Sequence, residues 1–213
     1  MNALARAWYA VLQQVARVLF VMVFGIRVFG RSHLPRRGGV LVVSNHQSYL
    51  DPVLAAVGMP RPFHPMARAS LFRLAPLAWL IRSLHAFPVR LGSADMGAIR
   101  EALRRLKGGA VVLMFPEGTR TRDGSIGPLQ AGPVLLARRA GVPILPVVID
   151  GAFEAWPRTH PLPRPHRIRV ACGRPVSPQA SGRGDAAEIV QGLRHQMLDL
   201  QRRLRSMAGM ETR

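Results

Sequence analysis

The stretch GVLVVSNHQSYLDPVLAAVG, residues 39–58, decides the fold. It begins with an apolar run typical of a strand buried on both faces, and it ends in DPVLAAVG, which predicts a short helix with Pro52 in its first turn. Between the strand and the helix stand His46 and Asp51, five positions apart. A strand that passes through a polar turn into a helix is typical of proteins that alternate the two elements.

The same alternation continues along the chain. Residues 96–109, MGAIREALRRLKGG, place apolar side chains at helical spacing and end in glycines, and residues 110–115, AVVLMF, form a continuous apolar run. We expect another helix from about Pro133 to Arg139, followed by the apolar strand VPILPVVIDG at residues 142–151. The pattern predicts an α/β fold with a mainly parallel central sheet covered by helices.

The C-terminal part adds one strand and one helix to this prediction. Residues 166–173, HRIRVACG, alternate apolar and polar side chains, which favours a strand at the edge of the sheet. The last helix carries one apolar face, made of Ile189, Leu193, Met197, Leu200 and Leu204. We therefore predict one α/β domain over residues 33–213.

Residues 1–32 form an apolar segment ahead of that domain. Arg17 and Arg27 interrupt it, and the uncharged run between them is about half as long as a membrane-spanning helix requires. No small-residue cleavage site follows the apolar core, which argues against a cleaved signal peptide. We predict a membrane-associating helix that lies in the interface, with Trp8 and Tyr9 at headgroup level. The alternative is an ordinary helix packed on the domain.

The chain carries a formal net charge of +19, almost all of it from arginine, because Lys107 is the only lysine. Such a charge implies an anionic partner, either nucleic acid, acidic lipid headgroups, a phosphorylated substrate or an acidic carrier protein. Nucleic acid is disfavoured because the aromatic residues are few, and the densest group of them lies in the apolar N-terminal segment instead of interleaving with the arginines. The single Cys172 excludes an internal disulfide and favours a reducing, cytosol-facing location.

Four motifs carry a family resemblance. Residues 45–51, NHQSYLD, and residues 115–120, FPEGTR, resemble the His-x4-Asp box and the Glu-Gly box of the glycerolipid acyltransferases similar to 1-acylglycerol-3-phosphate acyltransferase. Residues 85–95, HAFPVRLGSAD, are similar to the second box, and residues 142–151 to the fourth. The resemblance covers about Gly38 to Gly151 and implies an enzyme.

The implied reaction moves a fatty acyl group from an acyl thioester to the free hydroxyl of a lysophospholipid. The expected acceptor is 1-acylglycerol-3-phosphate, giving phosphatidate, and the donor is acyl-CoA or acyl carrier protein, with no further cofactor. The expected location is the cytoplasmic face of the inner membrane, on an anionic membrane surface. Two alternatives stay open: another lyso-lipid acceptor, such as lyso-ornithine lipid, and a non-catalytic basic protein that binds lipid or nucleic acid.

His46 and Asp51 suit this chemistry on physical grounds alone. An alcohol is a poor nucleophile at neutral pH, so its proton must be removed as the oxygen attacks the thioester carbonyl, and an imidazole can accept that proton. Asp51, across a tight turn, could hold the other ring nitrogen, fix the tautomer and stabilise the imidazolium. The substrate supplies the nucleophile, so no serine is required. The other histidines show no metal-ligand spacing, and no metal is expected.

The resemblance assigns substrate binding to six residues: Arg68, Arg90, Glu117, Gly118, Thr119 and Arg120. Arg90 and Arg120 would grip the acceptor phosphate, because a guanidinium offers a fork of donors. Glu117 would accept from a glycerol hydroxyl or order the arginines, and Gly118 would let the backbone approach the ligand. Two positions depart from the family pattern, with Arg68 and Gln130 where lysine is typical.

Overall fold

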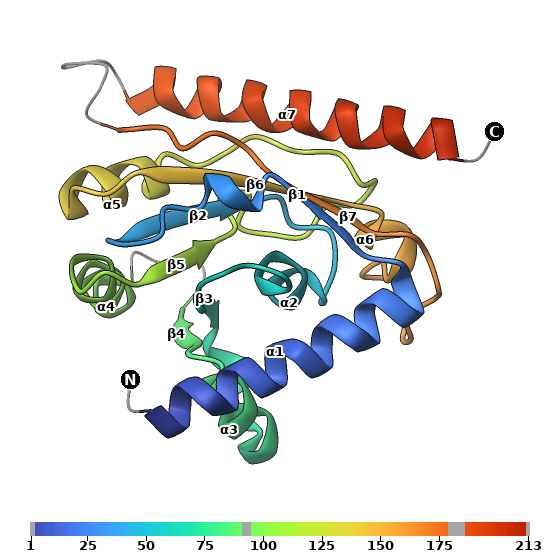
Figure 1. Ribbon diagram of the computed structural model, residues 1–213. Coiled ribbons are helices and arrows are strands. Elements are labelled where there is room, and N and C mark those ends of the chain that lie inside the picture. Colours follow the sequence, from blue (N-terminus) through green and yellow to red (C-terminus); the bar gives the residue numbers. More distant parts are fainter. Residues whose placement is uncertain (1–2, 91–94, 179–185, 212–213) are drawn as a thin grey trace.

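The computed structural model describes residues 3–90, 95–178 and 186–211 (Figure 1). Its strands are β1 (Arg27–Phe29), β2 (Val40–Ser44), β3 (Phe63–Arg68), β4 (Phe87–Val89), β5 (Val111–Met114), β6 (Ile144–Asp150) and β7 (Arg169–Cys172). Its helices are α1 (Ala3–Phe24), α2 (Asp51–Ala56), α3 (Ala75–Ser83), α4 (Met96–Lys107), α5 (Gly132–Ala140), α6 (Ala152–Ala155) and α7 (Ala186–Glu211), with 3-10 turns η1 (Arg31–His33) and η2 (Ala69–Arg73). Strands and helices alternate, as the sequence predicts.

The strands form one sheet in the order β1-β7-β6-β2-β5-β3-β4. All neighbouring pairs are parallel except β6 and β7. The prediction of an α/β fold with a mainly parallel sheet is therefore confirmed.

The prediction that HRIRVACG forms an edge strand is wrong. Strand β1 pairs in parallel with β7, with Arg27 opposite Arg169, so β7 lies inside the sheet and is buried along its length. The sequence pattern missed this because the short strand β1 falls within residues 1–32, for which the sequence predicts one helical segment. The sheet therefore begins inside the segment that the sequence associates with a membrane.

Helices cover both faces of the sheet, and β2 shows why its sequence is apolar throughout. Val40 and Val42 pack in a cluster with side chains of α1 and α2, whereas Leu41 and Val43 pack on the opposite face with α4, α5 and α7. Figure 1 shows α7 lying across one face and α1 and α2 on the other. A strand buried on both sides needs apolar residues at every position.

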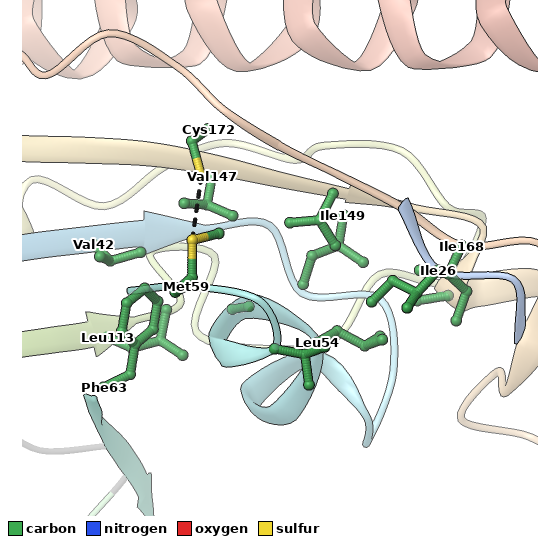
Figure 2. Packing of buried hydrophobic residues seen from close by; sticks show 14 of the residues in the cluster. Ile26, Val42, Leu54, Met59, Phe63, Leu113, Val147, Ile149, Ile168 and Cys172 are labelled. Carbon is green, nitrogen blue, oxygen red and sulfur yellow. Dashed lines mark hydrogen bonds between the residues drawn. The ribbon is translucent and has the colours of Figure 1, made fainter. Parts of the chain in front are cut away.

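The cluster under α2 contains the only cysteine, as Figure 2 shows. The thiol of Cys172 on β7 lies 3.8 Å from the sulfur of Met59, among side chains that include Leu54 and Phe63. Burial raises the pKa of Cys172 to about 12. Cys172 is therefore a neutral packing residue, because only the thiolate is reactive.

Helix α1 is largely apolar on both its buried and its exposed side. Tyr9, Phe20 and Phe24 are buried against the domain. Its outward side chains include nine exposed large apolar residues, at positions 4, 8, 11, 15, 18, 19, 21, 22 and 23. Ala7–Phe24 has a mean hydropathy of 1.5, so by length and composition alone this helix could cross a membrane. A single such helix near the N-terminus is weak evidence for a membrane span. The placement of Tyr9 at headgroup level is wrong, because its ring is buried and its hydroxyl accepts from the N–H of Phe63 at 3.1 Å. The interfacial placement of the rest of the helix stays a prediction.

The parallel strands bring the motifs to one edge. The carboxyl ends of β2, β5, β3 and β4 are neighbours in the sheet, and the turns that follow them carry the polar residues of the sequence motifs. In α/β sheets this edge is where ligands bind. The shared position of the motifs is therefore a consequence of topology.

Candidate active site

The turn between β2 and α2 brings His46 against Asp51. The Nδ1 atom of His46 lies 2.7 Å from Oδ2 of Asp51, and the backbone N–H groups of Gln47 and Ser48 donate to the same oxygen at 2.6 and 2.7 Å. Asp51 is fully buried at the start of α2, whereas the His46 side chain is 21% exposed. The acid is thus enclosed while the imidazole remains open to a ligand.

This geometry fixes how the imidazole can act. Because Nδ1 of His46 is held by a carboxylate, that nitrogen carries the proton and Nε2 is the one that can accept. Complete burial raises the pKa of Asp51, and the hydrogen bonds from His46, Ser48 and Gln47 oppose the rise. The nearby Ser44 and Ser48 are buried, and their hydroxyls bond to backbone groups. The arrangement is that of a base with its orienting acid.

Glu117 holds the backbone of the turn between β2 and α2. Its Oε1 accepts from the N–H of His46 at 2.8 Å, and its Oε2 accepts from the N–H of Gly127 at 3.0 Å. Burial raises the pKa of Glu117, and these two hydrogen bonds oppose that effect. The carboxylate therefore joins the turn after β2 to the loop after β5. The contact with a glycerol hydroxyl that the sequence suggests stays a prediction.

Two further contacts fix His46 from the loop after β5. The ring of Phe115 stacks on the imidazole, with centroids 4.1 Å apart and planes at 19°. The N–H of Thr121 donates to the carbonyl of His46 at 2.7 Å. Together with Glu117, these contacts leave the base little freedom to move relative to the Glu-Gly box.

Gly118 has a backbone reason to be glycine. Its φ of +71° lies in the left-handed region, and a Cβ there would come within 3.0 Å of the side-chain nitrogen of Gln130. Gln130 itself stands where the family typically has lysine, and its N–H closes the loop by donating to the carbonyl of Pro116 at 3.0 Å. Gly118 and Thr119 are exposed at the surface of this loop.

The three arginines of the motifs lie at different distances from His46. Arg120 is half-buried, and its guanidinium carbon lies 3.5 Å from the ring centroid of Tyr49, in the turn between β2 and α2. Arg68 ends β3 opposite Val89 of β4, so Arg68 and Arg90 are exposed neighbours further along the same edge. Strand β4 is three strands from β2, roughly 14 Å between backbones. The second motif continues into residues 91–94, which lie outside the described residues.

Sequence reasoning missed two residues that hold the turn after β2 in place, Asn45 against β6 and Gln47 against α6 and the loop after β5. The side chain of the fully buried Asn45 exchanges two hydrogen bonds of 2.8 Å with the backbone of Ile149. The amide of Gln47 donates to the carbonyl of Gly124 at 3.0 Å and accepts from the N–H of Phe153 at 3.3 Å. The available signal was the presence of two amides beside His46, a polar pair unusual next to a buried strand.

The groups that the site offers to a ligand are side chains. Within residues 3–90, 95–178 and 186–211, no three His, Cys, Asp or Glu side chains gather as a metal ion would require. What the geometry offers is an accessible imidazole nitrogen beside cationic side chains. Such a site can take a proton from a hydroxyl while an anionic group is held nearby.

Known proteins resemble this chain in sequence and in structure. The sequence model of the Acyltransferase family matches residues 25–150, more than half of the chain. The chain is 29% identical to a 1-acyl-sn-glycerol-3-phosphate acyltransferase of Bacillus subtilis over 63% of its own length and 67% of that protein. It is 33% identical to the alpha form of that enzyme from Mus musculus, over 85% of its own length and 66% of the relative.

A solved structure shares the fold. The crystal structure of the 1-acyl-sn-glycerophosphate acyltransferase PlsC from Thermotoga maritima superposes with a TM-score of 0.80 at 24% identity, over 94% of this chain and 81% of the other. At that identity the likeness supports the fold alone, whereas the family assignment rests on the sequence match. This chain belongs to the Acyltransferase family.

Proposed function

We propose that this protein transfers a fatty acyl group from an acyl thioester to the free hydroxyl of a lysophospholipid, with 1-acylglycerol-3-phosphate as acceptor and phosphatidate as product. The observation that carries the proposal is the 2.7 Å hydrogen bond between the accessible His46 and the buried Asp51. The names of the relatives from Bacillus subtilis and Mus musculus support the choice of acceptor.

The reaction needs one proton to move twice. The acceptor hydroxyl attacks the thioester carbonyl carbon as Nε2 of His46 takes its proton, which gives a tetrahedral intermediate and an imidazolium stabilised by Asp51. The carbon–sulfur bond then breaks, and the imidazolium returns the proton to the departing thiolate. The products are the new ester and the free thiol of the donor, CoA or acyl carrier protein, with His46 neutral again.

Three arginine side chains at the carboxyl edge of the sheet form a cationic surface for the acceptor phosphate. Arg120 lies beside the catalytic turn, and Arg68 and Arg90 extend the positive surface along the carboxyl edge of the sheet. Guanidinium groups bind phosphate through paired, charge-assisted hydrogen bonds. We assign the phosphate to Arg120 and Arg90, with Arg68, which ends the strand between them, as a third cation, while Gly118 and Thr119 form the loop that the headgroup approaches.

The acceptor and the acyl chains are lipids, so the enzyme must work at a membrane. Exposed apolar side chains of α1 and of the η2–α3 segment form what we call the docking surface: Trp8, Val11, Val15, Val18, Leu19, Val21, Met22, Val23, Leu71, Leu74, Trp79 and Leu80. The rings of Trp8 and Trp79, 5.9 Å apart, join the two parts, and Figure 1 shows α3 beside α1. We propose that this surface lies in an anionic leaflet at the cytoplasmic face of the inner membrane, where the charge of +19 is favourable.

An assay of the purified full chain in mixed vesicles tests the reaction. A panel of lyso-lipid acceptors, including lysophosphatidate and lyso-ornithine lipid, is offered with acyl-CoA and with acyl carrier protein as donors. We expect lysophosphatidate to give the highest kcat/KM. A higher value with lyso-ornithine lipid would overturn the acceptor assignment, and no transfer to any acceptor would overturn the proposed function.

Flotation with anionic vesicles tests the docking surface. Removing the whole segment would be uninformative, because Phe20 and Phe24 belong to the core. The exposed residues Leu19 and Met22 can instead be changed to Gln together, with Leu135→Gln on the exposed side of α5 as the control. We expect the double variant to stay in the soluble fraction while the control floats. Equal flotation of the two would contradict this placement of the membrane.

A further inference from the structure

Among the residues that the structure describes, Arg120 is held by an aromatic ring and not by a carboxylate. Its guanidinium carbon lies 3.5 Å from the ring centroid of Tyr49, closer than the other two cation–ring contacts of the described residues. Its buried Nη1 atom has no hydrogen-bond partner among the described residues. A buried donor without an acceptor is costly, so this atom indicates a ligand that supplies one.

The type of contact matters for what Arg120 can bind. An acidic partner would occupy the fork of N–H donors, whereas an aromatic face attracts the cation and leaves the in-plane donors free. Tyr49 therefore restricts the orientation of the guanidinium without consuming the hydrogen bonds that recognise phosphate. Because the ring orders this long side chain before the ligand arrives, less conformational entropy is lost on binding.

Tyr49 is itself held in place from two sides. It lies in the turn that Asp51 closes, three residues after His46. Its ring contacts that of Trp156, with centroids 5.3 Å apart and planes at 51°, and the indole N–H of Trp156 donates to the carbonyl of His160 at 3.0 Å. One short turn thus carries both the base and the support for the cation.

We propose that Tyr49 is a positioning residue that sets Arg120 relative to His46, so that the enzyme selects acceptors in which a phosphate lies close to the free hydroxyl. The proposal rests on the proposed function, in which Arg120 holds the acceptor phosphate and His46 takes the hydroxyl proton. A lysophosphatidate fits this requirement, because its free hydroxyl and its phosphate stand on neighbouring glycerol carbons. Acceptors with the anionic group further from the hydroxyl would lose one of the two contacts.

Two substitutions of Tyr49 separate the ring from the hydroxyl. The side chain is 54% exposed, so Tyr49→Leu and Tyr49→Phe should both fold, with unfolding midpoints near that of the wild type. We expect Tyr49→Leu to raise the acceptor KM by roughly 3- to 30-fold, the range of a cation–ring contact, with the donor KM unchanged. Tyr49→Phe, which keeps the ring, should restore most of the affinity. A merely structural role would change the unfolding midpoint or both KM values together.

A double-variant cycle closes the test. In an Arg120→Ala background, the further change Tyr49→Leu should alter the acceptor KM less than about twofold, because the cation that the ring positions is absent. Equal effects of Tyr49→Leu with and without Arg120 would overturn the inference, as would an acceptor KM of Tyr49→Leu equal to that of the wild type. Both outcomes require a wild-type enzyme that acylates lysophosphatidate, so failure of the proposed function would appear first and separately.

Discussion

Histidines lie near both ends of the parallel strands, which we call the carboxyl edge and the amino edge of the sheet. The two sites differ in the charge of the neighbouring side chains. At the carboxyl edge, Nδ1 of His46 lies 2.7 Å from the carboxylate of Asp51. At the amino edge, Nδ1 of His64 lies 3.0 Å from a guanidinium nitrogen of Arg105, and its ring stacks on His85 with centroids 4.9 Å apart. Nδ1 of the imidazole therefore donates a hydrogen bond in His46 and accepts one in His64.

The comparison teaches that the partner decides whether a histidine can do chemistry. The carboxylate of Asp51 holds Nδ1 of His46, which leaves Nε2 as the nitrogen that can accept a proton in a reaction. Burial and the charge of Arg105 lower the pKa of His64 to about 3, which keeps it neutral. There the rings serve packing, because His85 also stacks on Tyr9 of α1, with centroids 5.5 Å apart. In the proposed function, the carboxyl edge serves proton transfer, whereas the rings at the amino edge attach the N-terminal helix.

Removing the charge at the carboxyl edge should have the largest effect. Asp51→Asn keeps the size of the side chain but can hold the imidazole in the wrong tautomer and cannot stabilise the imidazolium. We expect kcat to fall by roughly a hundredfold to ten-thousandfold. Steady-state kinetics with lysophosphatidate measures this, with circular dichroism to check the fold. A folded variant with unchanged kcat would show that the carboxylate does not support the base.

Changing the shape of a cation without its charge should have the next largest effect. Arg120→Lys and Arg90→Lys each lose a fork of donors to the phosphate, and we expect the acceptor KM to rise roughly ten- to a hundredfold. Arg203→Lys on the exposed side of α7 is the matched control. Measured acceptor KM values that are alike for Arg120→Lys and Arg203→Lys would contradict the assignment of the Glu-Gly motif to the phosphate.

Loosening the backbone that carries the base should have a smaller effect. Glu117→Gln keeps one acceptor oxygen for the N–H groups of His46 and Gly127 but turns the other into a donor. Since the turn would shift, we expect kcat to fall roughly five- to fiftyfold with little change in the acceptor KM. A rise in the acceptor KM with kcat unchanged would favour the glycerol-hydroxyl role suggested by the sequence.

The smallest effect should be a weak pH dependence of the stability of the fold, which arises from His64 at the amino edge. The pKa of His64 is about 3 in the fold, against an ordinary 6.5, so the unfolded chain takes up a proton that the folded one refuses. This contribution to stability is complete above pH 6.5 and declines as the pH falls toward 3. Arg105, Arg104 and His85 oppose protonation, and Glu101 favours it.

The matched comparison for this effect is His64→Gln, which can still accept from Arg105. Between pH 6.5 and 4.5 we expect the unfolding midpoint of the wild type to drop by roughly a few degrees more than that of the variant. The difference between the two slopes is the informative quantity, because the raised pKa values of Asp51 and Glu117 act in the opposite direction in both proteins. Parallel slopes would contradict the neutral state of His64.

The features that the sequence predicted well are local. Apolar runs and Pro52 within residues 39–58 predict a strand, a turn and a helix. The separation of His46 and Asp51 across that turn then predicts that the two side chains pair. The motif order then placed the Glu-Gly loop at the same edge, because parallel strands share their carboxyl ends.

The features that the sequence did not predict depend on contacts between distant residues. The hydrogen bond from the backbone of His46 to Glu117 spans 71 positions, and no periodicity reports it. The pairing of β1 with β7 joins Arg27 to Arg169, and a strand of three residues inside an apolar segment leaves no pattern of its own. Tyr49 likewise gains its role only when folding brings Arg120 over its ring.

The most direct test of the account is acyl transfer to lysophosphatidate by the wild type, His46→Ala and His195→Ala, all as full chains in mixed vesicles. His195 is an exposed histidine on α7 and serves as the control. The account predicts phosphatidate formation at similar rates by the wild type and His195→Ala, and a rate at least about a hundredfold lower for His46→Ala with an unchanged unfolding midpoint. A folded His46→Ala protein that forms phosphatidate at a rate near that of the wild type would contradict it.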